Sequence, residues 1–174
     1  KLCFCKYALL FINQIMCMKK FYTLFFGGLF FYSANAQTNI FSYGSSWKYL
    51  ANGTNQGTAW TGTGFSDGAW LNGNGQFGYG DGDEATVISY GPSATTKYIT
   101  TYFRKTISIA STTAFSSFTA NVKRDDGIIV YVNGVERYRN NITTGTVTYT
   151  TLATNASDDG ATQQTFTIAT GSFV

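Results

Sequence analysis

The chain of 174 residues has no histidine, one proline and three cysteines, and only 12% of its residues are charged. The cysteines (Cys3, Cys5 and Cys17) all precede residue 37, so the remaining chain has no thiol to form a disulfide or to bind zinc or iron. Without an imidazole to accept a proton, it also lacks a Ser-His-Asp or Cys-His nucleophilic site. These absences exclude the common metal and nucleophile sites of hydrolases from residues 37–174.

The net charge of +3 belongs to the N-terminal region of the chain. The only charged residues before residue 48 are lysines, at positions 1, 6, 19 and 20. Residues 37–174 carry eight basic and nine acidic side chains, a net charge of −1. They contain no stripe of Lys and Arg, so nucleic acid is not an expected partner.

Residues 18–36 have the three parts of a secretory signal peptide. Two lysines follow Met18, an apolar run covers residues 21–32, and Ala34 and Ala36 stand at the small-residue positions of a cleavage site. We expect cleavage after Ala36 and a protein that is secreted or held on the cell surface, with no membrane contact after cleavage. The alternative is an uncleaved anchor, although the apolar run is shorter than the roughly 20 residues that span a bilayer.

Residues 1–17 precede a complete signal peptide and do not begin with Met. We interpret them as an upstream overhang and exclude them from the fold. The alternative is a longer leader with two apolar segments divided by Lys19 and Lys20. Residues 37–174 are expected to form a single domain.

The composition of residues 37–174 predicts an all-β fold. Gly, Ser, Thr and Asn make up 64 of these 138 residues, and Leu occurs only three times. Threonine and aromatic residues favour strands, whereas few helix formers are present. The expected strands cover residues 99–109, 115–123, 128–132, 135–139 and 164–169, and Asn133-Gly134 predicts a type I′ hairpin turn. Between residues 53 and 82 we expect long loops, with short strands around Trp60 and Trp70.

A series of motifs resembles the galactose-binding-like jelly-roll module of large secreted bacterial proteins. In order they are Trp47-Lys48-Tyr49, Trp60, Phe65-Ser66-Asp67-Gly68-Ala69-Trp70, Phe77-Gly78-Tyr79-Gly80, Tyr102-Phe103-Arg104, Asp125-Asp126-Gly127 and Tyr131-Val132-Asn133-Gly134-Val135-Glu136. The resemblance implies a jelly-roll β-sandwich over residues 45–174. It also implies that the chain ends before the last strand of the module, and that other domains of the same parent chain, such as a metallophosphoesterase, are its neighbours.

Asp125 and Asp126 form a candidate site for a structural Ca²⁺, because paired carboxylates at a turn offer the oxygen ligands that this cation prefers. Asp125-Asp126-Gly127 before a Tyr-x-Asn-Gly hairpin also resembles the PA14 module, the second choice of fold, in which paired aspartates hold calcium beside a sugar. The alternative is that both residues only serve the turn. A second acidic segment, Gly80–Glu84, lacks the spacing of an EF-hand and is expected to be a solvated loop.

Aromatic side chains on loops indicate a carbohydrate site, because rings stack on the C–H faces of sugars while polar side chains bind the hydroxyls. The expected ligand-binding residues are Trp60, Trp70 and Tyr79, with Asp67, Asn72 and Asn74 as polar partners. The alternative for the tryptophans is a place in the core. Asp67 is also a candidate cap or brace for its own loop, or a candidate ligand of a structural ion. Arg104 is expected to pair with an acidic residue or cover an aromatic ring.

The sequence therefore leaves two hypotheses. In the first, the domain is a secreted, non-catalytic module that binds carbohydrate or a cell-surface glycan for a larger protein. In the second, it is a structural domain that packs against a downstream hydrolase. A pair of carboxylates suffices for glycoside hydrolysis, but nothing in the sequence fixes their separation, so no catalytic residue is predicted.

Overall fold

The computed structural model describes residues 2–5, 14–19, 37–155 and 158–173. These residues form twelve β-strands and three single-turn 3₁₀ helices, and no α-helix occurs among them. The predicted all-β class is confirmed. No helix in these ranges is long and apolar enough to cross a membrane.

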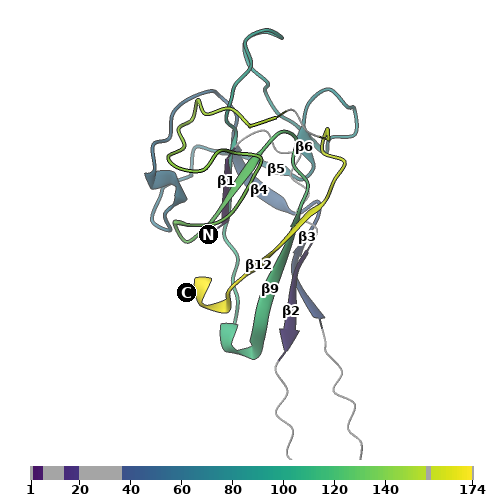
Figure 1. Ribbon diagram of the computed structural model, residues 1–174, viewed down its shortest axis with the longest axis vertical. Helices are drawn as coiled ribbons and strands as arrows, with labels where there is room; N and C mark the ends of the chain where they lie inside the picture. The colour runs from purple at the N-terminus through teal and green to yellow at the C-terminus, as the bar shows by residue number, and fades with distance from the viewer. Residues whose placement is uncertain (1, 6–13, 20–36, 156–157, 174) are drawn as a thin grey trace, which may run out of the picture.

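Ten of the strands lie in two antiparallel sheets (Figure 1). The six-stranded sheet has the order β11 (Val135–Asn140), β10 (Ile128–Val132), β1 (Leu2–Cys5), β8 (Tyr102–Lys105), β4 (Ser46–Leu50) and β5 (Leu71–Asn74). The four-stranded sheet has the order β12 (Gln164–Ile168), β9 (Phe115–Val122), β2 (Gln14–Lys19) and β3 (Gln37–Ser42). A short parallel pair, β6 (Phe77–Gly78) and β7 (Thr86–Val87), stands apart from both sheets.

The main core lies between the two sheets, because both contribute to one buried cluster. The six-stranded sheet supplies residues such as Phe103 and Val130, and the four-stranded sheet supplies Phe118 and Val122, all with no exposed surface. Alternation along β9 produces this burial, since Phe118, Ala120 and Val122 share the inward face as the sequence predicts. The two sheets therefore enclose a common core, while the jelly-roll connectivity remains a prediction.

Local sequence patterns predict several elements correctly. β10 coincides with the expected strand over residues 128–132, and Asn133 and Gly134 have φ of 50° and 85°, so the predicted type I′ turn is confirmed. The expected strand over residues 99–109 is shorter, because its pairing with β4 and β1 involves only residues 102–105. Around Trp60 the expected strand is wrong, and a 3₁₀ helix, Ala59–Thr61, stands there instead. The other two 3₁₀ helices cover Thr112–Ala114 and Thr170–Ser172.

β1 and β2 belong to the residues that the sequence assigns to the overhang and to the start of the signal peptide. Each lies inside a sheet, with a neighbouring strand on both sides. The fold in the structure therefore includes residues that we excluded from fold prediction. Cleavage after Ala36 itself remains a prediction.

The two edges of the six-stranded sheet are protected in different ways. Edge strand β11 carries the exposed residues Glu136 and Arg137. At the other edge, the Thr86 hydroxyl accepts a hydrogen bond from the backbone N–H of Asn74 (2.9 Å) and donates one to the Asn74 carbonyl oxygen (2.8 Å). The Thr86 side chain thus takes the place of a further strand at this point.

A second aromatic cluster covers the outer face of the six-stranded sheet. Trp60, Trp70 and Tyr102 are 4%, 6% and 2% exposed, and Phe65 and Tyr131 pack against them. Tyr102 and Phe103 are neighbours on β8, so their side chains point to opposite faces of the sheet. Both faces of β8 are therefore covered, which explains why this strand is buried almost throughout.

Arg104 fixes the loop that carries part of this second cluster. Its guanidinium, 1% exposed, donates to the Asp67 carboxylate (Nε to Oδ2, 2.8 Å) and to the carbonyl oxygen of Gly62 (3.0 Å), and it lies 5.0 Å from the ring centre of Phe65. Lys48 reaches the other carboxylate oxygen at 3.2 Å. Asp67 is thus a brace for its own loop, and both expected roles of Arg104 are confirmed.

We expect Arg104→Met to lower the free energy of unfolding by about 2–4 kcal/mol, because it leaves a partly buried carboxylate with only Lys48 as its cationic partner. The same change at the exposed Arg137 is the control and should cost less than about 1 kcal/mol. Urea unfolding of the two variants measures both values. Equal losses would show that the Arg104–Asp67 pair does not hold the loop.

Candidate functional site

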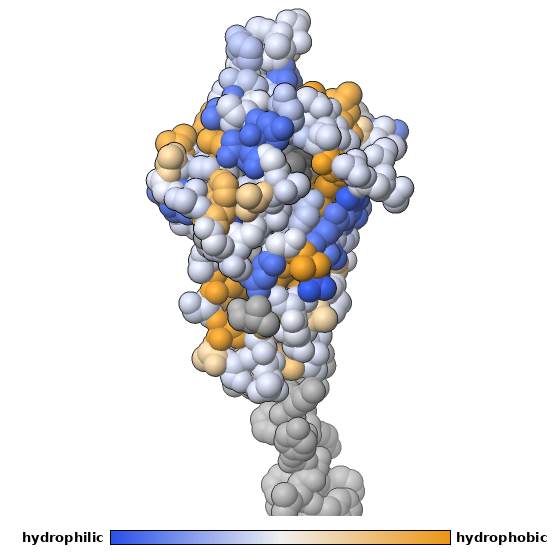
Figure 2. Space-filling view, turned by 90° about the vertical axis from the view of Figure 1, so that its left-hand side faces the viewer, coloured by the Kyte–Doolittle hydropathy of each residue, from blue (hydrophilic) through white to orange (hydrophobic). Residues whose placement is uncertain are grey.

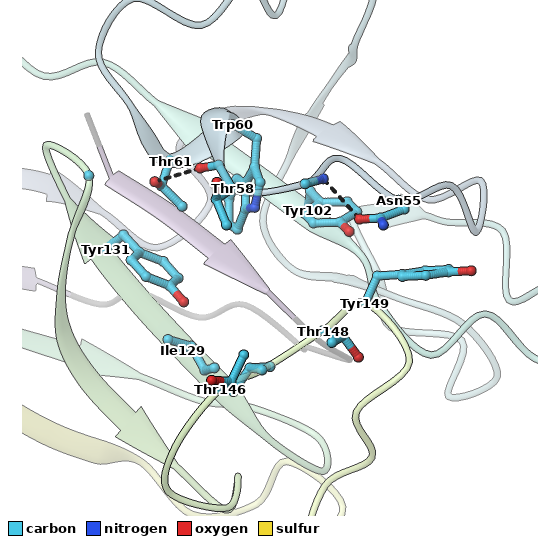
Figure 3. Close-up of a pocket in the computed structure, with 13 residues that line it drawn as sticks. Asn55, Thr58, Trp60, Thr61, Tyr102, Ile129, Tyr131, Thr146, Thr148 and Tyr149 are labelled. Carbon is cyan, nitrogen blue, oxygen red and sulfur yellow. Dashed lines mark hydrogen bonds between the residues drawn. The ribbon is translucent and has the colours of Figure 1, made fainter.

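A pocket of about 450 Å³ opens beside the second aromatic cluster (Figure 3). We call it the aromatic pocket. Its walls come from three segments that are far apart in the sequence: the loop around the first 3₁₀ helix, the strands β8 and β10, and the segment that follows β11. Its lining residues are Asn55, Gly57, Thr58, Trp60, Thr61, Tyr102, Ile129, Tyr131, Gly134 and residues 146–149.

Aromatic rings form much of the wall. The Trp60 ring packs edge-on against Tyr102, with centroids 4.9 Å apart, and against Tyr131 at 5.7 Å. These contacts hold Trp60 in one position, because T-shaped pairs at this separation are favourable. Tyr149 stands at the rim with 37% of its surface exposed, and its backbone oxygen accepts a hydrogen bond from the Thr100 hydroxyl (2.7 Å). The pocket thus has a rigid ring inside and an accessible ring at its rim.

The polar groups of the aromatic pocket are hydroxyls and an amide. Thr61 donates its hydroxyl to the carbonyl oxygen of Thr58 (3.0 Å), and Asn55 accepts from the backbone N–H of Gly57 (2.9 Å). Thr146 and Thr148 lie on the opposite wall, where the close-up shows both beside the cavity (Figure 3). The described residues that line the pocket include no Asp, Glu, Lys or Arg. Its chemistry is therefore that of a neutral, hydroxyl-rich surface.

Strand β1 lies between two strands that line the aromatic pocket. It pairs with β8 on one side and with β10 on the other, so it passes between Tyr102 and Tyr131. The close-up shows this strand in pale purple, with Tyr131 on one side and Trp60 and Tyr102 on the other (Figure 3). The separation of Tyr102 and Tyr131 consequently depends on a strand in this position.

A second pocket, of about 390 Å³, gathers four carboxylates and is called the acidic pocket here. Asp81, Asp125, Asp126 and Asp159 line it together with Phe77, Gly78, Tyr79, Ile88, Lys97 and Leu152. The Lys97 ammonium group lies 5.2 Å from the ring centre of Tyr79, which also packs against Tyr90 at 5.3 Å. The predicted metal residues and one predicted sugar-binding residue therefore lie in the same pocket.

Two Asp-Asp-Gly turns supply three of these carboxylates. Asp126 and Asp159 both have left-handed backbone conformations, with φ of 51° and 53°. In the first turn the Asp125 carboxylate accepts a hydrogen bond from the Asp126 backbone N–H (2.8 Å), as expected of a turn residue. At Gly127 a Cβ would lie 2.5 Å from the Ile142 side chain and 3.0 Å from the Asn141 carbonyl oxygen, so a larger residue requires these neighbours to shift.

Two carboxylates of the acidic pocket, Asp125 and Asp81, have raised pKa values. Partial burial raises the pKa of Asp125, and the charges of Asp126, Asp159 and Asp81 add to this effect, against the lowering by its hydrogen bond from Asp126. The pKa of Asp81 is also raised, by desolvation and by Asp159, Glu84 and Asp83. No group of three or more possible metal ligands stands close enough to hold an ion among the residues placed in the structure. The pocket therefore concentrates negative charge without a formed coordination shell.

The acidic segment Gly80–Glu84 is a loop at the surface, as predicted. Its residues are exposed except Glu84, which is partly buried. The Glu84 carboxylate accepts hydrogen bonds from the backbone N–H groups of Asp81 and Gly82, both at 3.0 Å. These bonds, first of all that from Asp81, lower the pKa of Glu84. Glu84 consequently stabilises the shape of its own loop.

The structure distributes the six predicted ligand-binding residues over different places. Trp60 lines the aromatic pocket and Tyr79 the acidic pocket, whereas Asp67, Trp70, Asn72 and Asn74 line neither. Trp70 packs against Phe65 and Tyr102, so the expected exposed stacking face is wrong and the core alternative holds for this residue. Asn72 and Asn74 lie exposed on edge strand β5.

Several pocket residues carry no functional signal in the sequence. Tyr131 stands in a predicted strand and in the last motif of the resemblance, and Tyr149 stands in a Thr-rich segment without periodicity. For Asp159 a signal is present, because Asp158-Asp159-Gly160 repeats the tripeptide of residues 125–127. Beside the first of these turns, the buried Arg124 guanidinium pairs with Asp158 (Nη1 to Oδ1, 2.9 Å) and donates to the Asn140 side-chain oxygen.

The surface beyond the pockets shows no single extended apolar area in the view of Figure 2, where apolar side chains form separate patches among polar ones. Comparisons with protein families, with curated proteins and with solved structures found no match for this chain. The resemblance to galactose-binding-like modules therefore stays a prediction.

Proposed function

We propose that residues 37–174 belong to a secreted, non-catalytic module that binds a neutral carbohydrate in the aromatic pocket. The observation that carries this proposal is the lining: aromatic rings and threonine hydroxyls surround the cavity, without a charged side chain among the described lining residues. Sugars present C–H faces to rings and hydroxyls to hydrogen-bonding groups. A neutral lining favours an uncharged sugar over a phosphorylated or sulfated one.

The dimensions of the aromatic pocket support the same conclusion. Its volume of about 450 Å³ lies within the roughly 300–1,000 Å³ that is usual for small-molecule sites. Thr146, Thr148 and Tyr149 are exposed at its opening, so a glycan chain has room to extend into solvent. We therefore propose that the partner is a cell-surface or extracellular glycan. The domain, with a galactose-binding-like jelly-roll topology, would bind this glycan for the larger protein to which it belongs.

Binding is favoured over hydrolysis in this pocket because glycosidases place two carboxylates across the scissile bond. Four of the nine carboxylates, those of Asp81, Asp125, Asp126 and Asp159, lie instead in the acidic pocket, and no described residue that lines the aromatic pocket carries a carboxylate. The proposal therefore assigns no catalytic residue.

Tyr149→Ala tests the site, and we expect about a tenfold loss of affinity for the bound glycan, equivalent to about 1.4 kcal/mol. The change removes an exposed ring at the rim while its backbone contact to Thr100 remains. A glycan array with the wild-type protein first identifies the ligand, and calorimetry then compares the variants. Trp60→Ala is unsuitable, because removing a buried tryptophan costs about 3–5 kcal/mol of stability.

Tyr90→Ala is the matched control, since Tyr90 is similarly exposed (41%) but lies against Tyr79 and not in the aromatic pocket. Its affinity should equal that of the wild type. An array on which the folded protein binds no neutral glycan would refute the proposal and favour the structural role beside a hydrolase.

The proposed structural Ca²⁺ belongs in the acidic pocket, with Asp125 and Asp126 joined by Asp81 and Asp159. These carboxylates are the oxygen ligands that Ca²⁺ prefers, and their mutual repulsion would be relieved by a cation. The charges support the proposal, although the side chains have to move together to coordinate an ion.

Asp125→Asn is expected to stabilise the calcium-free protein at pH 7. The raised pKa means that the folded state binds more protons than the unfolded state, so Asp125 costs stability as pH rises above its unfolded pKa. The amide oxygen retains the acceptor for the Asp126 N–H. Thermal unfolding should show a gain at pH 7 that shrinks below about pH 4.

In the presence of calcium, we expect the wild type to gain more stability than Asp125→Asn. Millimolar Ca²⁺ is expected to raise the melting temperature of the wild type more than that of Asp125→Asn, by the linkage between binding and folding. Glu136→Gln, on edge strand β11, is the control and should respond to Ca²⁺ like the wild type. An unchanged wild-type melting temperature would remove Ca²⁺ from the proposed function.

A further inference from the structure

β1 and β2 stand in the middle of their sheets, although they come from the N-terminal end of the chain. All four residues of β1 pair on both sides, with residues 102–105 of β8 and residues 129–132 of β10. Met16 and Cys17 of β2 likewise pair with both β3 and β9. Each segment is held by main-chain pairing along two edges at once.

Without these two strands the sheets lose their continuity. The six-stranded sheet would separate into β11–β10 and β8–β4–β5, and the four-stranded sheet into β12–β9 and an unpaired β3. Adjacent strands lie about 4.8 Å apart, so an empty position leaves a gap of about 10 Å between the flanking strands. Each empty position would therefore be the width of one strand, with an unpaired strand edge on either side.

The edges of these gaps lie in the most buried part of the domain. Phe103 and Val130, beside β1, have no exposed surface, and Phe118 and Ala120, beside β2, are 0% and 3% exposed. Backbone N–H and C=O groups at such positions need hydrogen-bond partners. An occupant therefore has to be an extended chain that satisfies both edges, which is the chemistry of β-strand addition.

We propose that the β1 and β2 positions form a strand-acceptor site, and that its occupants are residues 2–5 and 14–19 of this chain, bound by main-chain pairing whether or not they remain covalently joined to Gln37. The proposal rests on the predicted cleavage after Ala36 only for its biological setting. It does not depend on carbohydrate binding.

The strand-acceptor site lies next to the aromatic pocket. β1 lies between the two strands from which Tyr102 and Tyr131 line the pocket (Figure 3). Loss of the occupant would separate these two walls. Occupation of the strand-acceptor site is thus a condition for the pocket to have the shape described above.

The test uses the full chain with a specific protease sequence inserted between residues 20 and 36 and cut in the folded state. We expect the N-terminal fragment to remain with residues 37–174 during native gel filtration, with mass spectrometry identifying both pieces. Separation of the fragment from the rest of the chain would overturn the proposal.

A second measurement tests the register. A labelled peptide of residues 1–19 is mixed with the cut protein under reducing conditions in mild denaturant, so that it can replace the original fragment. The denaturant is then removed, and binding of the peptide is measured by fluorescence anisotropy. Phe4→Pro and Cys17→Pro peptides should bind about tenfold more weakly or worse, because proline removes a ladder hydrogen bond at a position paired on both sides.

A peptide with residues 1–19 in scrambled order is the control, and it should not remain bound, because its side chains no longer match the two strand positions. Equal binding of all four peptides would show adsorption without strand pairing and would overturn the proposal. The anisotropy readout needs no glycan, so failure of the proposed function leaves this result unaffected.

Discussion

The buried guanidinium of Arg104 is the interaction on which the outer face of the domain depends. A charge in this position is costly unless its donors are satisfied, and the carbonyl of Gly62 and the carboxylate of Asp67 satisfy them. Both acceptors lie on the loop that follows Trp60. The central strand β8 therefore fixes that loop, the loop fixes the tryptophan, and the tryptophan gives the aromatic pocket its inner wall.

Local chemistry made part of the fold predictable. β9 alternates apolar and polar residues because only one of its faces meets the core, and Asn133-Gly134 adopts the positive φ values that a tight hairpin requires. β10 reads as a continuous apolar run because the second aromatic cluster covers its outer face. In each case the decisive neighbours are close in sequence or the pattern repeats along one strand.

The sites were not predictable in the same way, because distant segments assemble them. The aromatic pocket joins residues 55–61 to β10 and to residues 146–149, and no periodicity links these stretches. The sequence around Trp70 indicates a loop residue, whereas in the structure Phe65 and Tyr102 pack against its ring. The two Asp-Asp-Gly turns could be recognised as a pair in the sequence, but their approach depends on the buried contact between Arg124 and Asp158. β1 and most of β2 lie before Met18, in the residues that the sequence assigns to an upstream overhang because a complete signal-peptide pattern follows them.

The protected edges of the six-stranded sheet oppose association between neighbouring copies of the domain. Exposed edge strands invite fibril growth between molecules, and charged side chains or an occupied backbone oppose it. Glu136 and Arg137 place charged side chains on edge strand β11. At the other edge, the Thr86 hydroxyl occupies the backbone N–H and carbonyl groups of Asn74. Copies displayed side by side at high density would therefore resist amyloid-like aggregation at both ends of this sheet.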